Sequence, residues 1–379
     1  MRNLMAKGGT VSTEFYKKSL LIGVHSPHNK TSDIQAYYQE FINLAQTYGV
    51  VEFVNVDVKL RSIDSAHYFT KGKLAEIKIL FDEGNFDEIL VSDVLSGQQE
   101  RNLNDMFDCP ILDRTRLILA IFEKSAVTAE GKIQVEIAKL EFAKTRVTGI
   151  GVTLDQQSGS VGIRSGPGET VKEATTRYLN RTIQTLKGHL IKIEKARGAQ
   201  RKKRLTQEIP QICLVGYTNA GKSTILNELT HSDVLAKDQL FATLDTTTRQ
   251  LFVNKRKVGL LSDTVGFIQQ LPHQLIESFK STLAELSYAS LLLVVTDIAD
   301  NNWRSHIDVV LKTLDEIEVE KEILFVFNKS DKITKKELQK RLESFDIDAP
   351  FVAVSCIKED GLAPLQKYLA SWKPKQDKK

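Results

Sequence analysis

The stretch Gly216-Tyr217-Thr218-Asn219-Ala220-Gly221-Lys222-Ser223 fits the pattern G-x-x-x-x-G-K-[ST] and decides the fold of the chain around it. Residues 212–215 predict a short buried strand before it, and residues 224–229 predict a helix after it. A glycine-bounded loop between a strand and a helix N-terminus presents backbone N–H groups and a positive dipole to a phosphate. In this context Lys222 is expected to reach the terminal phosphates, and the Ser223 hydroxyl is expected to ligate Mg²⁺.

Two further motifs follow in the order that a GTP-binding domain requires. At the end of a predicted strand, residues 263–266 fit D-x-x-G, where Asp263 would hold Mg²⁺ through a water and the Gly266 N–H could meet a γ-phosphate. Residues 328–331 fit N-K-x-D after another predicted strand. Asp331 can accept two donors from guanine that adenine lacks, so the sequence predicts guanine as the base.

The remaining contacts of the predicted nucleotide site come from neighbouring segments. Asn328 would meet the other edge of the base, the Lys329 stem would cover its ring, and the backbone of Ser355 and Cys356 could close over guanine O6. The full set of predicted nucleotide-binding residues is Gly216, Tyr217, Thr218, Asn219, Ala220, Gly221, Lys222, Ser223, Thr224, Phe241, Thr243, Asp263, Gly266, Asn328, Lys329, Asp331, Ser355 and Cys356.

A threonine-rich segment, residues 241–249, lies between the first two motifs. One threonine should complete the Mg²⁺ shell only when a γ-phosphate is present, which makes the segment an order–disorder switch. Thr247 is our first choice, with Thr243 and Thr246 as alternatives. The predicted metal ligands are therefore Ser223, Thr247 and Asp263.

The sequence does not identify the catalytic residue. Small GTPases of the Ras type place a water-orienting Gln directly after D-x-x-G. Phe267 stands at that position here, and a phenyl ring cannot orient water. Gln269, Gln270 and Arg249 are the nearby candidates, so we expect slow unaided hydrolysis that a partner stimulates.

Composition predicts a protein of the cytoplasm. The chain has 379 residues, of which 41% are hydrophobic, and 52 Lys and Arg face 48 Asp and Glu for a net charge of +4. Its three cysteines are far apart, which favours reduced thiols over disulfides or a metal site. We find neither a signal-peptide pattern nor an apolar run long enough for a membrane span, and we expect a monomer without integral membrane association.

Before the phosphate loop the chain divides into two parts. Predicted strands at 20–24, 50–58, 88–91 and 110–112 alternate with predicted helices at 32–48, 73–82 and 97–107, which indicates a parallel sheet covered by helices. Helices at 114–126 and 130–145 follow, then the glycine-rich residues 148–170, then a long helix. Its Leu179, Ile183, Leu186, Leu190 and Ile193 repeat as in a coiled-coil seam. An antiparallel helical hairpin is the expectation, and two helices of a compact bundle are the alternative.

The long helix carries a one-sided charge. Between residues 177 and 204 ten Lys or Arg face one acid, Glu194. Few of these charges can find i,i+4 partners, so we expect this helix to bind nucleic-acid phosphate rather than only to present a solvated face. With Tyr178 the only aromatic in this helix, structured RNA is favoured over a single strand. The predicted RNA-binding residues are Arg164, Arg177, Arg181, Arg201, Lys202, Lys203 and Arg204.

Several longer motifs resemble the HflX family of GTPases over nearly the whole chain. They are QERNL at 99–103, DRTRLIL at 113–119, EGKIQVE at 130–136, GPGE at 166–169, FATLD at 241–245, DTVGFI at 263–268 and LPH at 271–273. The resemblance implies binding to the large ribosomal subunit and its rRNA, ribosome-stimulated hydrolysis of GTP to GDP and phosphate, and splitting of stalled ribosomes under stress. It also implies possible use of ATP by the N-terminal domain.

The predicted fold class is α/β: an N-terminal α/β domain at 1–113, an antiparallel helical hairpin with a basic arm at 114–205, a doubly wound P-loop GTPase domain at 206–373 and a basic tail at 374–379. The predicted function is a GTPase, with Mg²⁺ as cofactor, that binds the ribosome and rescues it by dissociation. Two alternatives remain open at this point. One is a ribosome assembly factor that uses GTP as an occupancy signal, and the other is a GTP-regulated signalling adaptor without RNA.

Overall fold

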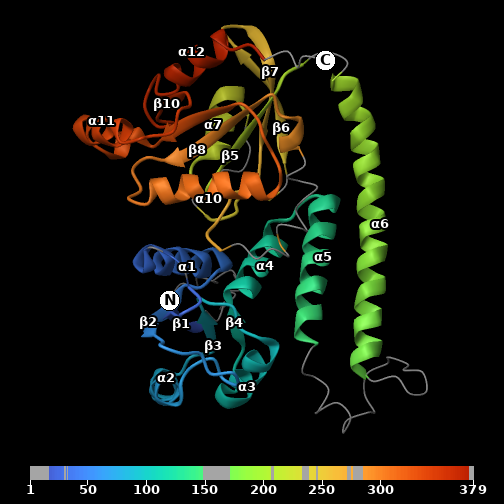
Figure 1. Ribbon diagram of the computed structural model, residues 1–379, viewed down its shortest axis with the longest axis vertical. Coiled ribbons are helices and arrows are strands. Elements are labelled where there is room, and N and C mark those ends of the chain that lie inside the picture. Colours follow the sequence, from blue (N-terminus) through green and yellow to red (C-terminus); the bar gives the residue numbers. More distant parts are fainter. Residues whose placement is uncertain are drawn as a thin grey trace, which may run out of the picture.

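A computed structural model describes residues 17–29, 31, 33–147, 171–205, 209–232, 239–244, 246–270, 275 and 285–374, with the side chains of 194 and 196–205 outside that description. Two separate sheets stand one above the other, and a long helix runs beside both (Figure 1). Every strand and helix predicted before the phosphate loop is present, with ends shifted by a few residues. No helix of the described residues is long and apolar enough to cross a membrane.

The first sheet has the order β2-β1-β3-β4, and all of its pairings are parallel. Side chains alternate between its faces, so Leu21 and Leu90 pack in one core and Leu20 and Ile22 in the other. Helix α1 covers the first face, while α2 and α3 cover the second. The elements are β1 (Lys18–His25), α1 (Ile34–Tyr48), β2 (Glu52–Lys59), α2 (Lys71–Gly84), β3 (Glu88–Val91), α3 (Gly97–Phe107) and β4 (Ile111–Asp113).

Local capping sets the helix boundaries in this domain. The Asp33 carboxylate accepts hydrogen bonds from the N–H groups of Gln35 and Ala36 and so begins α1. Ser96 and Gln99 form a reciprocal capping box that begins α3. Gly49 ends α1 in the left-handed region, with φ 119°, which glycine adopts without strain.

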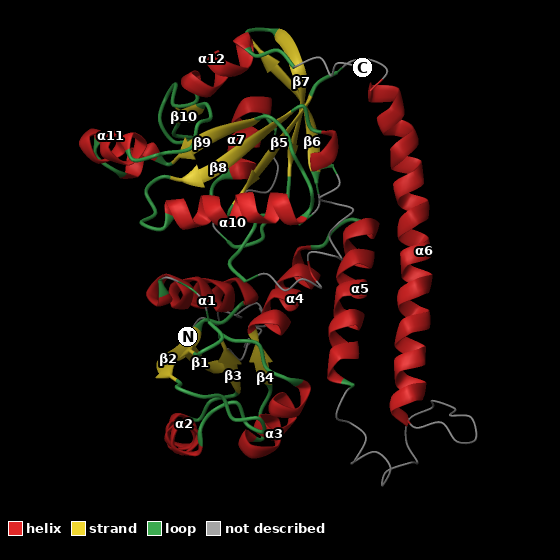
Figure 2. Cartoon of the chain, in the orientation of Figure 1, coloured by secondary structure: helices red, strands yellow, loops and turns green. Residues whose placement is uncertain are grey.

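Three helices link the two sheets. They are α4 (Arg114–Ser125), α5 (Ala129–Arg146) and α6 (Val171–Leu205). The end of α5 and the start of α6 lie side by side, so the two helices run antiparallel (Figure 2). Leu179 and Ile183 of the predicted seam are buried, whereas Leu186, Leu190 and Ile193 are half-buried. The glycine-rich residues 148–170 lie outside the described residues.

The second sheet has the order β10-β9-β8-β5-β7-β6, with helices on both faces. α7 and α12 contribute to the core on one face, and α10 and α11 to the core on the other. The elements are β5 (Gln211–Gly216), α7 (Lys222–Thr230), β6 (Thr247–Val253), β7 (Arg256–Asp263), η2 (Leu286–Tyr288), β8 (Leu291–Asp297), α10 (Trp303–Glu316), β9 (Ile323–Asn328), η3 (Ser330–Lys332), α11 (Lys335–Glu343), β10 (Phe351–Ala353) and α12 (Ala363–Ser371).

The edge strand β6 was not predicted from the sequence. It pairs antiparallel with β7, whereas the other pairings of this sheet are parallel. Asn254 and Lys255 join the two strands with φ of 51° and 63°, the backbone of a two-residue hairpin turn. Residues 247–249, predicted only as part of a switch segment, therefore begin a strand.

Candidate nucleotide-binding site

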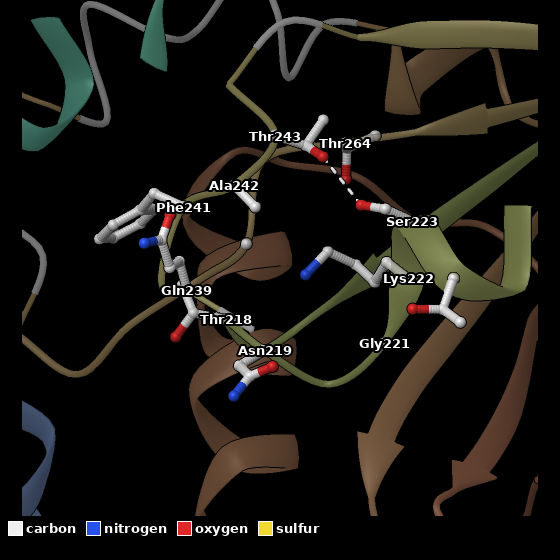
Figure 3. Close-up of a pocket in the computed structure, with 12 residues that line it drawn as sticks. Thr218, Asn219, Gly221, Lys222, Ser223, Gln239, Phe241, Ala242, Thr243 and Thr264 are labelled. Atoms are coloured by element: carbon white, nitrogen blue, oxygen red, sulfur yellow. Dashed lines mark hydrogen bonds between the residues drawn. The ribbon is translucent and has the colours of Figure 1, made fainter. Parts of the chain in front are cut away.

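The carboxyl end of β5 leads into the predicted phosphate loop, and α7 begins at its Lys222. A pocket opens here and is lined by Thr218, Asn219, Gly221, Lys222, Ser223, Thr224, Gln239, Phe241, Ala242, Thr243, Thr264 and Gly266 (Figure 3). The sequence did not single out Gln239, Ala242 or Thr264. They lie beside predicted residues in the chain, so proximity to the motifs was their only signal.

Glycine is required at two points of the loop. Gly221 has φ 93°, and a Cβ there would lie 2.3 Å from Asn328 Nδ2. At Gly216 a Cβ would lie 2.2 Å from the Val295 carbonyl oxygen. The loop is thus packed against the ends of β8 and β9, which brings the phosphate loop close to the predicted base-binding residues.

Lys222 points into the pocket from the first turn of α7 (Figure 3). Its Nζ donates to the carbonyl oxygens of Tyr217, at 2.8 Å, and Gly216, at 3.2 Å. Burial lowers the pKa of Lys222 to about 8, against the opposing effect of the Asp263 carboxylate. A phosphate would therefore offer this ammonium group a stronger acceptor than the carbonyls that it now contacts.

The predicted metal ligands Ser223 and Asp263 lie in contact. Ser223 Oγ donates to Asp263 Oδ2 at 2.6 Å and lies 2.8 Å from Thr243 Oγ1. Asp263 is fully buried, which raises its pKa, and its Oδ1 has no hydrogen-bond partner among the described residues. An unpaired buried carboxylate oxygen beside two hydroxyls is the hard-oxygen donor set that Mg²⁺ prefers.

The three threonines left open for the metal lie at different places. Thr243 lines the pocket and contacts Ser223. Thr247, our first choice, belongs to β6, where it pairs with Asp263 in the sheet register, and it is not among the described residues that line this pocket. Thr246 lies between them in the chain, at the wall of a neighbouring cavity that Thr243 and Thr247 also line. The geometry in this structure thus favours Thr243 over the first choice.

The residues predicted to bind guanine are brought together at the carboxyl end of β9. Asn328 Nδ2 donates to the Ala220 carbonyl at 3.0 Å, and Lys329 Nζ donates to the Asn219 carbonyl at 2.8 Å. Ser355 Oγ donates to Asp331 Oδ1 at 2.6 Å, which lowers the pKa of that carboxyl. An ionised Asp331 is the acceptor that the two guanine donors need.

Two contacts at the base site were not predicted. The Ser355 N–H donates to the Gly361 carbonyl at 3.1 Å, while its side chain contacts Asp331. Cys356 contributes its thiol, which donates to Asn328 Oδ1 at 3.5 Å. Burial raises the pKa of Cys356 to about 11, so it stays a neutral thiol at physiological pH.

Among the described residues that line this pocket are neither the water-orienting candidates Gln269 and Gln270, nor the arginine candidate Arg249, nor Phe267. Phe267 is buried in the core on the α10 face of the second sheet. The Gln269 side chain accepts a hydrogen bond from Thr31 at 3.3 Å, and Gln270 donates to Asn29 at 2.9 Å, so both contact the first domain. Arg249 is exposed on β6 and donates to a neighbouring backbone carbonyl. The catalytic residue remains unassigned among the described residues.

The predicted RNA-binding residues are spread along the chain rather than gathered in one patch. Arg177 and Arg181 are exposed one turn apart near the start of α6. Arg201, Lys202, Lys203 and Arg204 lie in its last turns, about 35 Å further along at 1.5 Å per residue. Arg164 lies outside the described residues. A ligand of both regions must therefore extend along the helix.

Three family models together match most of the chain. The model described as "GTP-binding GTPase N-terminal" matches residues 35–123, and "GTP-binding GTPase Middle Region" matches residues 125–204. The model described as "50S ribosome-binding GTPase" matches residues 211–329. These matches support GTP as the substrate and GTP hydrolysis as the reaction.

Individual relatives agree with the family models. The GTPase HflX of Magnetococcus marinus is 38% identical over 352 residues, covering 92% of this chain and 80% of the relative. The GTPase HflX of Escherichia coli (strain K12) is 41% identical over 314 residues, covering 82% and 73%. That of Caldanaerobacter subterraneus is 43% identical over 293 residues, covering 77% and 68%.

A solved structure shares the fold. The crystal structure titled SsGBP and GDP complex is 24% identical and superposes with a TM-score of 0.52, covering 93% of this chain and 97% of that one. Its similarity extends over both sheets and the helices that link them. The identities and coverage of the three relatives show that the chain belongs to the HflX family of GTPases.

Proposed function

We propose that this GTPase binds the large ribosomal subunit in the cytoplasm and, in its GTP state, promotes the dissociation of stalled ribosomes under stress. The ribosome would in turn stimulate GTP hydrolysis. The observation that supports this most strongly is the packing of the switch segment against the domain that carries the basic helix.

Each part of the proposed site has a distinct task. The phosphate loop and Lys222 would bind the β- and γ-phosphates, and the Gly266 N–H would meet the γ-phosphate. Asn328 and Asp331 would select guanine. Ser223, Asp263 and Thr243 would hold Mg²⁺, which when bound supplies charge neutralisation between the phosphates. Because Thr243 belongs to the switch segment, its position would depend on whether the γ-phosphate is present.

The switch segment lies in a core shared by the two sheets. Phe241 points away from Lys222 (Figure 3) and packs edge-to-face on Phe122 of α4, with ring centroids 4.6 Å apart. Leu240 and Leu244 join the same hydrophobic cluster. Helix α4 packs on α5, and α5 on α6. The switch segment thus contacts α4, α4 contacts α5, and α5 contacts the basic helix α6. A change of nucleotide that moves Thr243 would act on the first of these contacts.

The basic helix offers the chemistry for RNA. Arg177 and Arg181 are exposed, and α6 presents ten basic residues against one acid between residues 177 and 204. Neutralising phosphates along RNA releases counterions, so binding through this helix would weaken steeply as salt increases. The description "50S ribosome-binding GTPase" of the matching family model identifies the large subunit as the RNA to test.

Co-sedimentation with purified large subunits tests whether the basic helix α6 contributes to ribosome binding. Replacing Arg177 and Arg181 together by Gln should weaken binding about tenfold and reduce the salt dependence by about one phosphate contact per arginine. The matched control replaces Lys335 and Lys336, two exposed cations of α11, by Gln, and should bind as the wild type does. Equal affinity of both double variants would contradict a role for the basic helix.

A further inference from the structure

The phosphate loop and the residues after D-x-x-G are joined directly. Tyr217 and Phe267 form a parallel bridge, in which the Thr218 N–H donates to the Phe267 carbonyl at 2.8 Å and the Phe267 N–H donates to the Gly216 carbonyl at 3.1 Å. Gly266 is fixed by the same bridge, since a Cβ there would lie 2.9 Å from Thr218 Cα and 3.0 Å from Lys222 Nζ. Contacts that fix the position of Tyr217 therefore also fix the position of the Gly266 N–H.

Gln269, two residues after Phe267, is held at its N–H, its carbonyl and its side-chain oxygen. Its N–H donates to the Tyr217 hydroxyl at 2.9 Å, and its carbonyl accepts from Arg114 Nη2 at 3.1 Å. Its side chain accepts from Thr31. Thr31 belongs to the first domain and Arg114 to helix α4, which follows it, so the part of the chain before the phosphate loop fixes the backbone three residues beyond Gly266.

Glu40 of α1 connects these contacts. One of its carboxylate oxygens accepts the Tyr217 hydroxyl, and the other accepts Arg114 Nη2. The Glu40 side chain is 10% exposed and that of Arg114 only 1%. While its hydroxyl contacts Glu40, the Tyr217 ring stacks on His306 of α10, with ring centroids 3.9 Å apart. The tyrosine is thus clamped between the two domains.

The Glu40–Arg114 pair is not arranged as a purely structural ion pair. A guanidinium usually meets a carboxylate with two parallel hydrogen bonds. Here Arg114 uses Nη2 for both Glu40 and Gln269, while its buried Nε and Nη1 have no hydrogen-bond partner among the described residues. The second oxygen of Glu40 is given to Tyr217 instead. Each residue thus makes one hydrogen bond to the nucleotide domain, Glu40 to Tyr217 and Arg114 to Gln269.

We infer that Glu40 of the first domain and Arg114 of α4 are positioning residues for γ-phosphate recognition, acting through Tyr217 and Gln269 on the Gly266 N–H. Neither residue touches the nucleotide. They preorganise the donor, so that GTP binding need not order it, and this benefit is absent for GDP. The inference rests on the placement of the γ-phosphate beside Gly266 and is independent of ribosome binding.

The test compares Glu40→Gln and Tyr217→Phe with the wild type in the absence of ribosomes. Competition against a fluorescent nucleotide measures the affinity of each protein for a non-hydrolysable GTP analogue and for GDP. In each variant the ratio of GTP-analogue affinity to GDP affinity should fall about 3–10-fold, as expected for the loss of one hydrogen bond. The double variant should lose no more than the larger single effect, because both changes break the same contact.

The control is Glu88→Gln, the same change at another buried carboxylate of the first domain. Glu88 accepts from Ser19 Oγ at 2.8 Å within the first sheet and should leave the preference unchanged. If Glu40→Gln does not fold, Tyr217→Phe, which removes a single hydroxyl, still decides the matter. Equal losses of GTP-analogue and GDP affinity, or additive effects in the double variant, would overturn the inference.

Gly266→Ala separates this inference from the site on which it rests. The added methyl would press on Thr218 and should itself reduce the preference for the GTP analogue. An unchanged preference in Gly266→Ala would refute the placement of the γ-phosphate. A loss in Gly266→Ala with no change in Glu40→Gln and Tyr217→Phe would refute only the role of the first domain.

Discussion

The hydroxyl oxygens of Ser223 and Thr243 lie 2.8 Å apart, one on the first turn of α7 and the other in the switch segment. Both also contact the buried carboxyl of Asp263. If this trio holds Mg²⁺ together with a γ-phosphate, Thr243→Ala should weaken binding of a GTP analogue about tenfold and leave GDP affinity nearly unchanged. Thr247→Ala is the matched control. Calorimetric titrations with Mg²⁺ measure these affinities. A loss of GTP-analogue affinity in Thr247→Ala but not in Thr243→Ala would make Thr247 the Mg²⁺ ligand.

Lys222 provides a prediction on pH. Its pKa is lowered to about 8 by burial, and a bound phosphate should raise that pKa because it favours the charged form. Nucleotide binding should therefore take up a proton near pH 8, and affinity should fall up to tenfold per unit at higher pH. Titrations in buffers of different ionisation enthalpy measure this uptake. Lys222→Arg, which stays charged, should abolish it, and persistence of the uptake in that variant would assign the proton to another group.

Asp331 provides a prediction on base specificity. Its carboxylate accepts from Ser355, and we propose that it also accepts from guanine. Asp331→Asn should cost GTP binding about 1–3 kcal/mol and shift preference toward xanthosine triphosphate, whose extra carbonyl suits an amide donor. Competition between the two nucleotides checks this. Unchanged affinity for GTP would contradict base recognition by Asp331.

Glu40 provides a prediction on stability. Burial raises the pKa of Glu40 to about 7 from an ordinary value of 4.5, although the Arg114 charge opposes that rise. Asp300 of the second domain adds to the rise, and Tyr217 and Arg114 are the groups that contact the carboxyl. Between about pH 4.5 and 7 the folded protein binds more protons than the unfolded chain, so the contribution of Glu40 to stability declines as pH rises through this window.

The measurement is the thermal unfolding midpoint of the wild type and Glu40→Gln between pH 5 and 8. Relative to the variant, the wild type should lose up to about 3 kcal/mol of stability over this range, most of it below pH 7. Above pH 8 the difference should be constant. A difference that does not vary with pH would show that Glu40 titrates at its ordinary value.

Short motifs with a physical mechanism made the nucleotide site predictable. The loop at 216–223, Asp263 and Asn328–Asp331 lie on the carboxyl ends of parallel strands, so the order of the motifs and the strand–helix alternation were enough to bring them together. The helical spacing of apolar residues predicted the helices in the same way. Gly97–Phe107, bounded by its capping box, begins and ends where the sequence predicted.

The parts that could not be predicted depend on contacts between distant segments. Glu40, Arg114 and Tyr217 lie far apart in the chain, and no motif connects a carboxylate on one helix to a tyrosine in the loop of another domain. The choice among three threonines depends on where β6 begins, and that strand was missed. Its turn, Asn254-Lys255, lacks the glycine that most clearly signals a two-residue hairpin.

Sucrose-gradient sedimentation of stalled ribosomes tests whether GTP binding drives this protein to separate ribosomal subunits. Excess protein with a non-hydrolysable GTP analogue should raise the ratio of free subunits to intact ribosomes. GDP, or the Lys222→Ala variant with the analogue, should leave that ratio unchanged. An unchanged ratio with the wild type and the analogue, despite co-sedimentation with the large subunit, would contradict the splitting function.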